Sequence, residues 1–380
     1  MYLLEHDAKG VLGAYGVPVP EGILIEDASE LDVSRLPSGP WMVKGQIAAG
    51  GRGKAGIVRK AGSEREVSDL ARSLIGIRVA GKRVTSVRVE QQISAATEVY
   101  IGFIVDAAAG GVRVIVSERG GVEIEAVPAD IVNDETVIAD REAMVAAVHR
   151  LTERMSAPVG AALRHAATDL ARVFLEREAV LVEINPLFVR GDGTWIAGDA
   201  KIVTDDNALE RQPELRNLVQ QRASVYAEVA LKLEHGFDYV VVDPEGEIGL
   251  LTTGAGLSMM LIDELRAEGL KPYNFLDVRT GGLRGETTRL VKVLQWLGEA
   301  PRMRVVLINI FAGITELGEF SKLLVSAIRH APALRVPVVA RLVGNGLPAA
   351  QAVLAEAGIA LHTELDAAVA DVRKHLAGRV

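Results

Sequence analysis

Short apolar stretches alternate with longer amphipathic ones from Tyr239 onward, and this alternation is the strongest constraint on the fold. The expected strands are 239–242, 248–251, 304–309 and 336–342, and the expected helices are 257–267, 317–328 and 349–357. Parallel strands need a crossover, usually a helix, before the next strand can pair. The pattern therefore predicts a parallel, doubly wound α/β domain in the C-terminal part of the chain.

Three expected strand-to-helix turns in this domain are rich in small residues, at 253–256, 311–315 and 344–348. Ligands of such sheets bind at the carboxyl ends of the strands, where helix N-termini attract anions. Three turns of this kind favour an anion site over the alternative that small residues only permit tight turns. Glu316 and Glu319 fall in the first turn of the helix that follows one of them, where they stabilise the helix end but oppose a bound phosphate.

The residues before about 225 have a different pattern, in which short strands and hairpins predominate. Two β-rich runs, 100–106 and 112–116, flank a Gly-containing turn and predict a hairpin. The stretch 141–178 is expected to be helical, and 212–235 to be a polar helix that connects two domains. The domains are expected at 1–225 and 237–380.

A glycine-rich segment with three cations, VKGQIAAGGRGKAG, occupies residues 43–56. It is not a P-loop, because Lys54 is followed by Ala55 rather than Ser or Thr. It is not a dinucleotide fingerprint, because a strand-like stretch at 57–59 follows the glycines and a capping box opens the next helix only at 63–66. The glycines therefore connect strand to strand, either as a flap over phosphates or as an ordinary mobile hairpin.

A second hairpin carries polar side chains on one face. It runs through VEINPL (182–187), an Asp-Gly turn at 192–193 and AGDAK (197–201). With the turn centred near residue 192, Asn185 faces Asp199, and Glu183 and Lys201 share that face because side chains alternate along a strand. Oxygen ligands on adjacent strands suit Mg²⁺, and the alternative is a solvated polar face with a salt bridge.

Composition limits the class of protein. The length of 380 residues allows two domains with separate cores, and the absence of cysteine fits a reducing compartment. A net charge of −8 argues against nucleic acid as a partner. No apolar run is long enough to span a bilayer, and the start of the chain has no secretory signal, so a cytoplasmic protein without membrane contact is expected.

Together these segments resemble the β subunit of ADP-forming succinate–CoA ligases (succinyl-CoA synthetases) and relatives such as malate–CoA ligase. The resemblance covers nearly the whole chain. The matching segments are AK at 8–9, GVP at 16–18, GGRGKAG at 50–56, GGVEIE at 120–125, EINPL at 183–187, DNAL at 206–209, GAGL at 254–257, NFLDV at 274–278 and NIF at 309–311.

The resemblance implies an ATP-grasp domain followed by a flavodoxin-like CoA-ligase domain. It also implies Mg²⁺ as cofactor, ATP/ADP and CoA as substrates, and a small carboxylic acid such as succinate. The residues implied for ATP are Lys44, Gly51, Arg52 and Gly53 at the phosphates, Glu90 and Ile93 near adenine, and Glu98 as a further contact. Those implied elsewhere are Asn185 and Asp199 for Mg²⁺, Glu183 beside the transferring histidine, and Thr253, Gly313, Ile314 and Thr315 for the acid.

In this family ATP phosphorylates a histidine, the phosphoryl group passes to the carboxylate, and CoA displaces it to form the thioester. That histidine and most of the CoA site belong to a separate α subunit. The histidines of this chain are His6, His149, His165, His235, His330, His362 and His375, and none falls in a glycine-flanked loop at the end of an expected strand. The expectation is therefore an obligatory α partner.

Departures from the family pattern are concentrated at the acid site. Thr253 replaces the usual Asn, Arg279 and Thr280 interrupt a glycine run, and Glu316 and Glu319 make the helix start more acidic. Three alternatives therefore stay open: a malate–CoA ligase-like enzyme, a lone ATP-grasp ligase that joins a carboxylate to an amine, and a nucleotide-binding regulatory subunit without catalysis. ATP or GTP preference, the acid, and the choice between αβ and larger assemblies are not fixed by the sequence.

Overall fold

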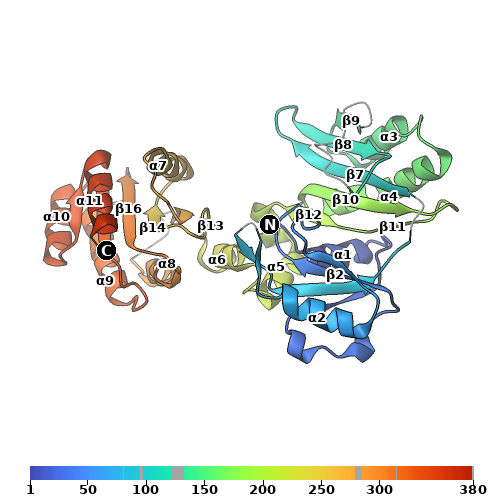
Figure 1. The fold of residues 1–380 in the computed structure, drawn as a ribbon. Coiled ribbons are helices and arrows are strands. Elements are labelled where there is room, and N and C mark those ends of the chain that lie inside the picture. The colour runs from blue at the N-terminus through green and yellow to red at the C-terminus, as the bar shows by residue number, and fades with distance from the viewer. Residues whose placement is uncertain (80, 95–96, 122–131, 279–284, 314, 379–380) are drawn as a thin grey trace. The chain divides into compact units, whose positions relative to one another are not determined.

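The chain forms two compact units, Met1–Leu218 and Val219–Val380 (Figure 1). The computed structural model describes residues 1–79, 81–94, 97–121, 132–278, 285–313 and 315–378. Helix α5 (Pro213–Gln221) spans the boundary between the units. Within these described ranges, none of the helices has both the length and the apolar character that crossing a bilayer requires.

Unit 1 contains a four-stranded sheet of order β1-β6-β2-β3 whose pairs are all antiparallel. Its strands are β1 (Gly22–Ile25), β6 (Ser86–Gln91), β2 (Trp41–Gln46) and β3 (Val58–Ala61). Helix α2 (Glu64–Leu74) packs on this sheet through Val67, Ala71 and Leu74, which lie on one helical stripe. The Ser63 side chain accepts a hydrogen bond from the Glu66 amide at the start of α2, so the expected helix start is confirmed.

The second sheet of unit 1 has the order β11-β10-β7-β8-β9, with β12 also paired to β10. Its strands are β7 (Thr97–Asp106), β8 (Gly111–Ser117), β9 (Val132–Val137), β10 (Ala179–Val189), β11 (Trp195–Ala197) and β12 (Lys201–Thr204). Strands β7 and β8 pair antiparallel, which confirms the hairpin expected there. Helices α3 (Arg141–Leu151) and α4 (Ala157–Glu176) contact this sheet. The smaller elements are α1 (Glu5–Ala14), β4 (Arg78–Val79), β5 (Lys82–Arg83) and 3-10 turns at Ala28–Glu30, Val33–Arg35 and Asp206–Arg211.

Two expected helices are each divided in the structure. The stretch 141–178 is broken between α3 and α4, where Pro158 lies in the first turn of α4. Proline is tolerated there but not in a helix interior, because it lacks an N–H and clashes with the preceding turn. The stretch 212–235 is broken between α5 and α6 (Ala227–His235), where Tyr226 has non-helical backbone angles and a buried side chain.

Unit 2 contains a parallel sheet of order β14-β16-β17-β18, as the strand–helix repeat predicts. Its strands are β14 (Ile248–Thr252), β16 (Val305–Ala312), β17 (Val338–Gly344) and β18 (Ala360–His362). The strand expected at 239–242 is not part of this sheet. It forms β13 (Asp238–Val241) and pairs antiparallel with β15 (Asn274–Asp277).

Helices cover both faces of the parallel sheet because residues alternate in direction along each strand. Val305 and Leu307 share one core with α7 (Ala255–Ala267) and α11 (Leu365–Ala377). Val306 and Ile308 share the other core with α8, α9 and α10. These three helices span Thr288–Glu299, Leu317–Arg329 and Leu347–Glu356. The sheet is buried on both faces, which is the doubly wound arrangement.

The close packing around Gly298 in α8 gives a stability test for unit 2. A Cβ on Gly298 of α8 would lie 2.4 Å from the carbonyl carbon of Ala333, whereas a Cβ on the exposed Gly10 of α1 would meet nothing within 4 Å. Gly298→Ala is expected to destabilise unit 2 by about 1–3 kcal/mol, because backbone atoms must move. Gly10→Ala is the matched control and is expected to stabilise unit 1 by about 0.5–1 kcal/mol. Urea unfolding of both variants measures the difference, and equal effects would contradict the assigned packing.

Candidate functional site

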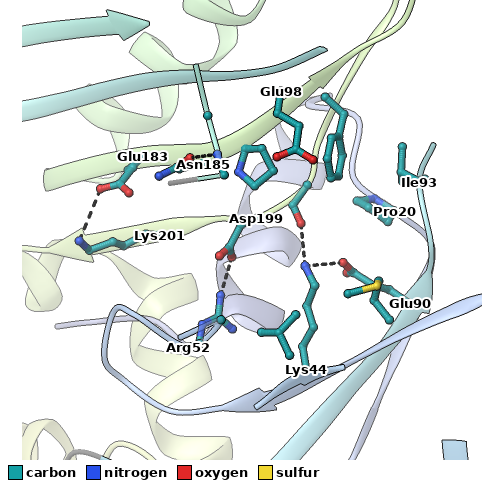
Figure 2. A pocket seen from close by; sticks show the side chains of 18 of the residues that line it. Pro20, Lys44, Arg52, Glu90, Ile93, Glu98, Glu183, Asn185, Asp199 and Lys201 are labelled. Atoms are coloured by element: carbon teal, nitrogen blue, oxygen red, sulfur yellow. Dashed lines mark hydrogen bonds and ion pairs between the residues drawn. The ribbon is translucent and has the colours of Figure 1, made fainter. Parts of the chain in front are cut away.

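A cavity of about 1330 Å³ lies in unit 1 and is lined by residues of both sheets (Figure 2). The residues implied for nucleotide, metal and phosphoryl transfer all line it. They are Lys44, Gly51, Arg52, Gly53, Glu90, Ile93, Glu98, Glu183, Asn185 and Asp199. The fold therefore brings together residues that are up to 155 positions apart, from Lys44 to Asp199.

The glycine-rich segment connects β2 to β3, which pair antiparallel, so the expected strand–loop–strand is confirmed. Gly51 and Gly56 have φ values of +71° and +70°, a backbone region that side chains other than glycine rarely adopt. The loop is closed by local hydrogen bonds, from the amides of Ala55 and Gly56 to the carbonyls of Gly51 and Gly53. Where this loop lines the cavity, its glycines leave the backbone uncovered by side chains.

Beneath this loop lies a cluster of charged groups, all of them buried except the partly exposed Asp199. Its members are the cations Lys9, Lys44, Arg52 and Arg88 and the carboxylates Glu5, Glu90 and Asp199. Glu5 is 2% exposed and holds Lys44 at 2.8 Å through Oε1 and Arg52 at 2.5 Å through Oε2. Glu90 is 1% exposed and contacts Lys44 at 2.7 Å through Oε1. Both glutamates thus fix the position of Lys44.

The remaining cations complete the cluster. The Lys9 ammonium is 2.7 Å from oxygens of both Glu5 and Glu90, and Arg88 Nε is 2.6 Å from Glu90 Oε2. Lys9 and Lys44 also donate hydrogen bonds to the carbonyl of Gly198, at 2.9 and 2.7 Å. Because Gly198 belongs to the segment that leads to Asp199, the lysines link the floor of the cavity to the polar hairpin.

The charges of the cluster change the pKa values of its members. Burial would raise the pKa of Glu5, but Arg52, Lys44 and Lys9 hold it well below the usual range. The pKa of Glu90 is also lowered, because Lys44 and Lys9 outweigh its burial. Glu5 and Glu90 raise the pKa of Lys44 against the opposite effect of burial. The buried carboxylates therefore stay ionised and Lys44 stays protonated at neutral pH.

This geometry changes the expectation for Glu90. Its carboxylate is bound by Lys9, Lys44 and Arg88, so the side chain is part of the buried cluster. A nucleotide in the cavity would meet Glu90 through its backbone at the end of β6 rather than through a free carboxylate. Ile93 lies on the same side of the cavity as Glu90, whereas Glu98 belongs to β7 of the second sheet (Figure 2).

The polar hairpin has the register that the sequence predicts. Glu183 pairs with Lys201, with Nζ and Oε2 3.5 Å apart, and Leu187 pairs with Ala197, so the turn is centred at residue 192. Between these pairs the ladder is interrupted, and Asn185–Pro186 is a cis peptide. Asn185 and Asp199 fall in this interruption and line the cavity, while Val182 and Ile184 are fully buried on the other side.

The two residues expected to hold Mg²⁺ have oxygen atoms directed at protein donors. Asn185 Oδ1 accepts a hydrogen bond from the Gly121 amide at 2.7 Å, and Asp199 Oδ1 lies 2.5 Å from Arg52 Nη2. The described residues contain no cluster of three or more His, Cys, Asp or Glu side chains that could hold a metal alone. One amide and one carboxylate fit a Mg²⁺ ion that keeps waters and shares the phosphates of a substrate.

The residues expected at the acid site lie at the carboxyl edge of the unit 2 sheet. Thr253 follows β14, and Gly313 and Thr315 follow β16, the neighbouring strand. Ile314 lies outside the described residues, as does the Arg279–Gly282 segment. The Thr253 hydroxyl is buried, and no hydrogen-bond partner is recorded for it among the described residues. It is therefore a polar group at this edge that a ligand could satisfy.

Glu316 has a defined structural role at the same edge. It is the N-cap of α9, and its carboxylate accepts a hydrogen bond from the Glu319 amide at 2.6 Å. The carboxylate also lies over Gly346, where a Cβ would overlap it. The acidic start of α9 thus satisfies the amide at its own helix end, where a negative charge would oppose a bound phosphate.

Neither Glu5 nor Arg88 has a role predicted from the sequence, and Lys9 enters there only as part of the AK segment of the resemblance. The available signal was the spacing of Glu5 and Lys9, four residues apart on a helix. Such a pair is commonly a solvated surface pair, and only the tertiary structure shows that both side chains are buried beside Lys44.

The cluster predicts a large effect of Glu5→Gln on stability. Without the Glu5 charge, two carboxylates remain for four buried or partly buried cations, and breaking a buried ion pair costs about 3–5 kcal/mol. Urea unfolding of unit 1 should show a loss of that size. Glu30→Gln, at an exposed side chain, is the control and should change stability by less than about 0.5 kcal/mol.

The same variant tests the pH dependence. The pKa of Glu5 is lowered in the folded protein, so its contribution is complete above the unfolded value of 4.5 and is lost as the pH falls through the lower, folded value. The native chain should therefore lose stability steeply below pH 4.5, and Glu5→Gln should show a shallower loss. Identical slopes would contradict a buried, ionised Glu5.

Comparisons with known proteins agree with this division of the chain. A family model described as an ATP-grasp domain matches residues 2–189, and one described as CoA-ligase matches residues 251–374. The fold of this chain is similar to that of a solved structure, ATP citrate lyase from Methanothrix soehngenii in complex with citrate and coenzyme A. The TM-score is 0.70 at 19% identity, over 95% of both chains, which shows a shared fold.

Curated relatives are more similar in sequence. The succinate–CoA ligase [ADP-forming] subunit beta of Desulfurococcus amylolyticus is 33% identical over 97% of both chains. The protein of the same name from Chloroflexus aurantiacus is 36% identical over 94% of both chains. The chain has an α/β fold in which an ATP-grasp domain precedes a CoA-ligase domain, and it belongs to the family of the β subunits of ADP-forming succinate–CoA ligases.

Proposed function

We propose that this chain is the nucleotide-binding subunit of an ADP-forming acid–CoA ligase. The reaction would consume ATP, CoA and succinate or a similar small dicarboxylate, and would yield the acyl-CoA thioester, ADP and phosphate. The observation that carries the proposal is the cavity of unit 1, where Lys44 and Arg52 lie opposite Asn185 and Asp199 (Figure 2). Membership of the ligase family and the CoA-ligase match in unit 2 support the same reaction.

The nucleotide would bind with its phosphates between the glycine-rich loop and the polar hairpin. Lys44 and Arg52 would neutralise phosphate charge, and the backbone at Gly51 and Gly53 leaves room for a close approach. Asn185 and Asp199 would hold Mg²⁺, which when bound would offset the charge of the phosphates. The adenine would lie toward Ile93 and the end of β6, with Glu98 as a further contact.

The phosphoryl group would pass to a histidine of a partner α subunit. None of the described residues that line the cavity is a histidine. Several histidines of the chain have structural partners: His6 contacts Arg88, His362 contacts Asp371, and His330 contacts the Ser326 carbonyl. Glu183, on the cavity side of β10, would then orient the incoming imidazole, since a carboxylate stabilises the proton on its other nitrogen.

In the later steps the phosphohistidine would transfer its phosphoryl group to the substrate carboxylate, and the CoA thiol would displace phosphate. Thr253, Gly313, Ile314 and Thr315 are proposed to face the acid, together with the α subunit. The buried hydroxyl of Thr253, which has no hydrogen-bond partner among the described residues, supports this assignment. The lack of cysteine in the 380 residues supports a cytoplasmic location.

The hairpin offers a matched pair of variants for the nucleotide site. Asp199 lines the cavity, whereas Asp192 lies exposed at the tip of the same hairpin. Asp199→Asn is expected to lower phosphorylation of the α-subunit histidine by about 100-fold or more, because it removes a charged metal ligand. Asp192→Asn removes the same charge and is expected to stay within about twofold of the native rate. Transfer of labelled phosphate from ATP is the measurement, and equal rates would exclude Asp199 from the site.

The acid is tested with the assembled αβ enzyme and a panel of small carboxylic acids. Succinate should support ATP- and CoA-dependent ADP release. Thr253→Val should raise the KM for the acid by about tenfold, because the hydroxyl proposed to hydrogen-bond the acid is lost. Turnover only with another acid such as malate would transfer the proposal to that substrate. Histidine phosphorylation without turnover of any acid would refute succinate, and no phosphorylation would refute the ligase function.

A further inference from the structure

Arg52 bridges two carboxylates with different surroundings. Its Nη1 lies 2.5 Å from Glu5 Oε2, and its Nη2 lies 2.5 Å from Asp199 Oδ1. The Glu5 side chain is 0% exposed, whereas the Asp199 side chain is 34% exposed and faces the cavity. A cation that enters from solvent can therefore reach Asp199 but not Glu5.

The contact with Asp199 places a positive charge at a proposed metal ligand. Figure 2 shows the Arg52 side chain rising from the glycine-rich loop to Asp199 on the polar hairpin. A guanidinium satisfies a carboxylate much as a metal ion does, by charge and by short contacts to oxygen. As long as Arg52 is bound there, Asp199 Oδ1 is not available to a second cation.

The glycines that flank Arg52 are exposed, so its loop has room to shift. A Cβ on Gly50, Gly51 or Gly53 would meet nothing within 4 Å, so the backbone on both sides of Arg52 is not tightly packed. The cluster tolerates the movement as well, because Glu5 would still hold Arg52 from its buried side. Glu5 is thus a fixed anchor, and Asp199 is the partner that can be exchanged.

We propose that Arg52 is a resident counter-cation of Asp199 that is exchanged for a divalent cation when the nucleotide site is filled, with Glu5 as the anchor that retains Arg52. The inference rests on the proposed function, since it uses the metal site assigned there. In the exchange no covalent bond changes: the Arg52–Asp199 ion pair opens, Asp199 binds the divalent cation, and the freed Nη2 donates to a phosphate oxygen. Metal and nucleotide therefore favour each other's binding, because the metal releases the cation that the phosphates need.

The test measures the affinity of the full chain for Mn²⁺ without nucleotide, from the free Mn²⁺ signal in electron paramagnetic resonance. Arg52→Gln removes the competing cation and is expected to tighten Mn²⁺ binding about three- to tenfold, as for a partly exposed charged hydrogen bond. Lys60→Gln is the matched control, because Lys60 is an exposed lysine that lines the same cavity. It should change the affinity less than about twofold, since a screened charge has little effect.

Two further variants make each result decisive. Asp199→Asn gives the background for binding elsewhere on the chain. If the native chain binds Mn²⁺ no better than Asp199→Asn, both the proposed metal site and the exchange are refuted. If the native chain binds better but Arg52→Gln matches Lys60→Gln or binds more weakly, the metal site stands and the exchange is refuted. Arg52→Lys, which keeps the charge without the fork that spans both carboxylates, should give a smaller gain and serves if Arg52→Gln does not fold.

Discussion

The ion pairs of Glu5 are the interaction on which the rest of the nucleotide site depends. This one buried carboxylate comes from the first helix of the chain, yet it holds Lys44 of β2 and Arg52 of the glycine-rich loop. Without it, two cations would be left in a region that excludes water, at a cost larger than a typical surface interaction could offset. The cluster therefore sets the positions of the cations before a ligand arrives, and it leaves one bond, Arg52 to Asp199, at the solvent side.

The polar hairpin supplies the opposite wall by a different physical device. Strand β10 pairs with β12 before Asn185 and with β11 after it, but the ladder opens at Asn185 and Asp199. Their side chains line the cavity, while Val182 and Ile184 remain in the core. The carbonyl of Gly198 accepts hydrogen bonds from Lys9 and Lys44 and so fixes this opening to the buried cluster. The glycine-rich loop with its cations and the polar hairpin are thus held by one network. This arrangement suits the binding of a nucleotide with Mg²⁺.

Much of this arrangement follows from local patterns. The capping box before α2, the β7–β8 hairpin, the register of the 182–201 hairpin and the parallel sheet of unit 2 depend on short-range rules that the sequence states directly. The divided helices at 141–178 and 212–235 were not predicted. The apolar helical spacing of 141–178 continues past Pro158, and the polar stretch 212–235 has no local signal that Tyr226 would be buried. The separate pairing of β13 with β15 was not predicted, because the sequence of a four-residue strand does not indicate which strand it pairs with.

The sequence by itself determined the class of each domain, the glycine-rich connection between strands and the shared face of Glu183, Asn185, Asp199 and Lys201. Those features depend on periodicity, turn chemistry and residue type, which act over a few positions. Only the tertiary structure decided that Glu90 points into a buried cluster, that Glu5 and Lys9 lie beneath the cavity, and that Arg52 contacts Asp199. Ionic contacts between residues far apart in the chain have no periodic signature, because they depend on how separate elements pack and exclude water.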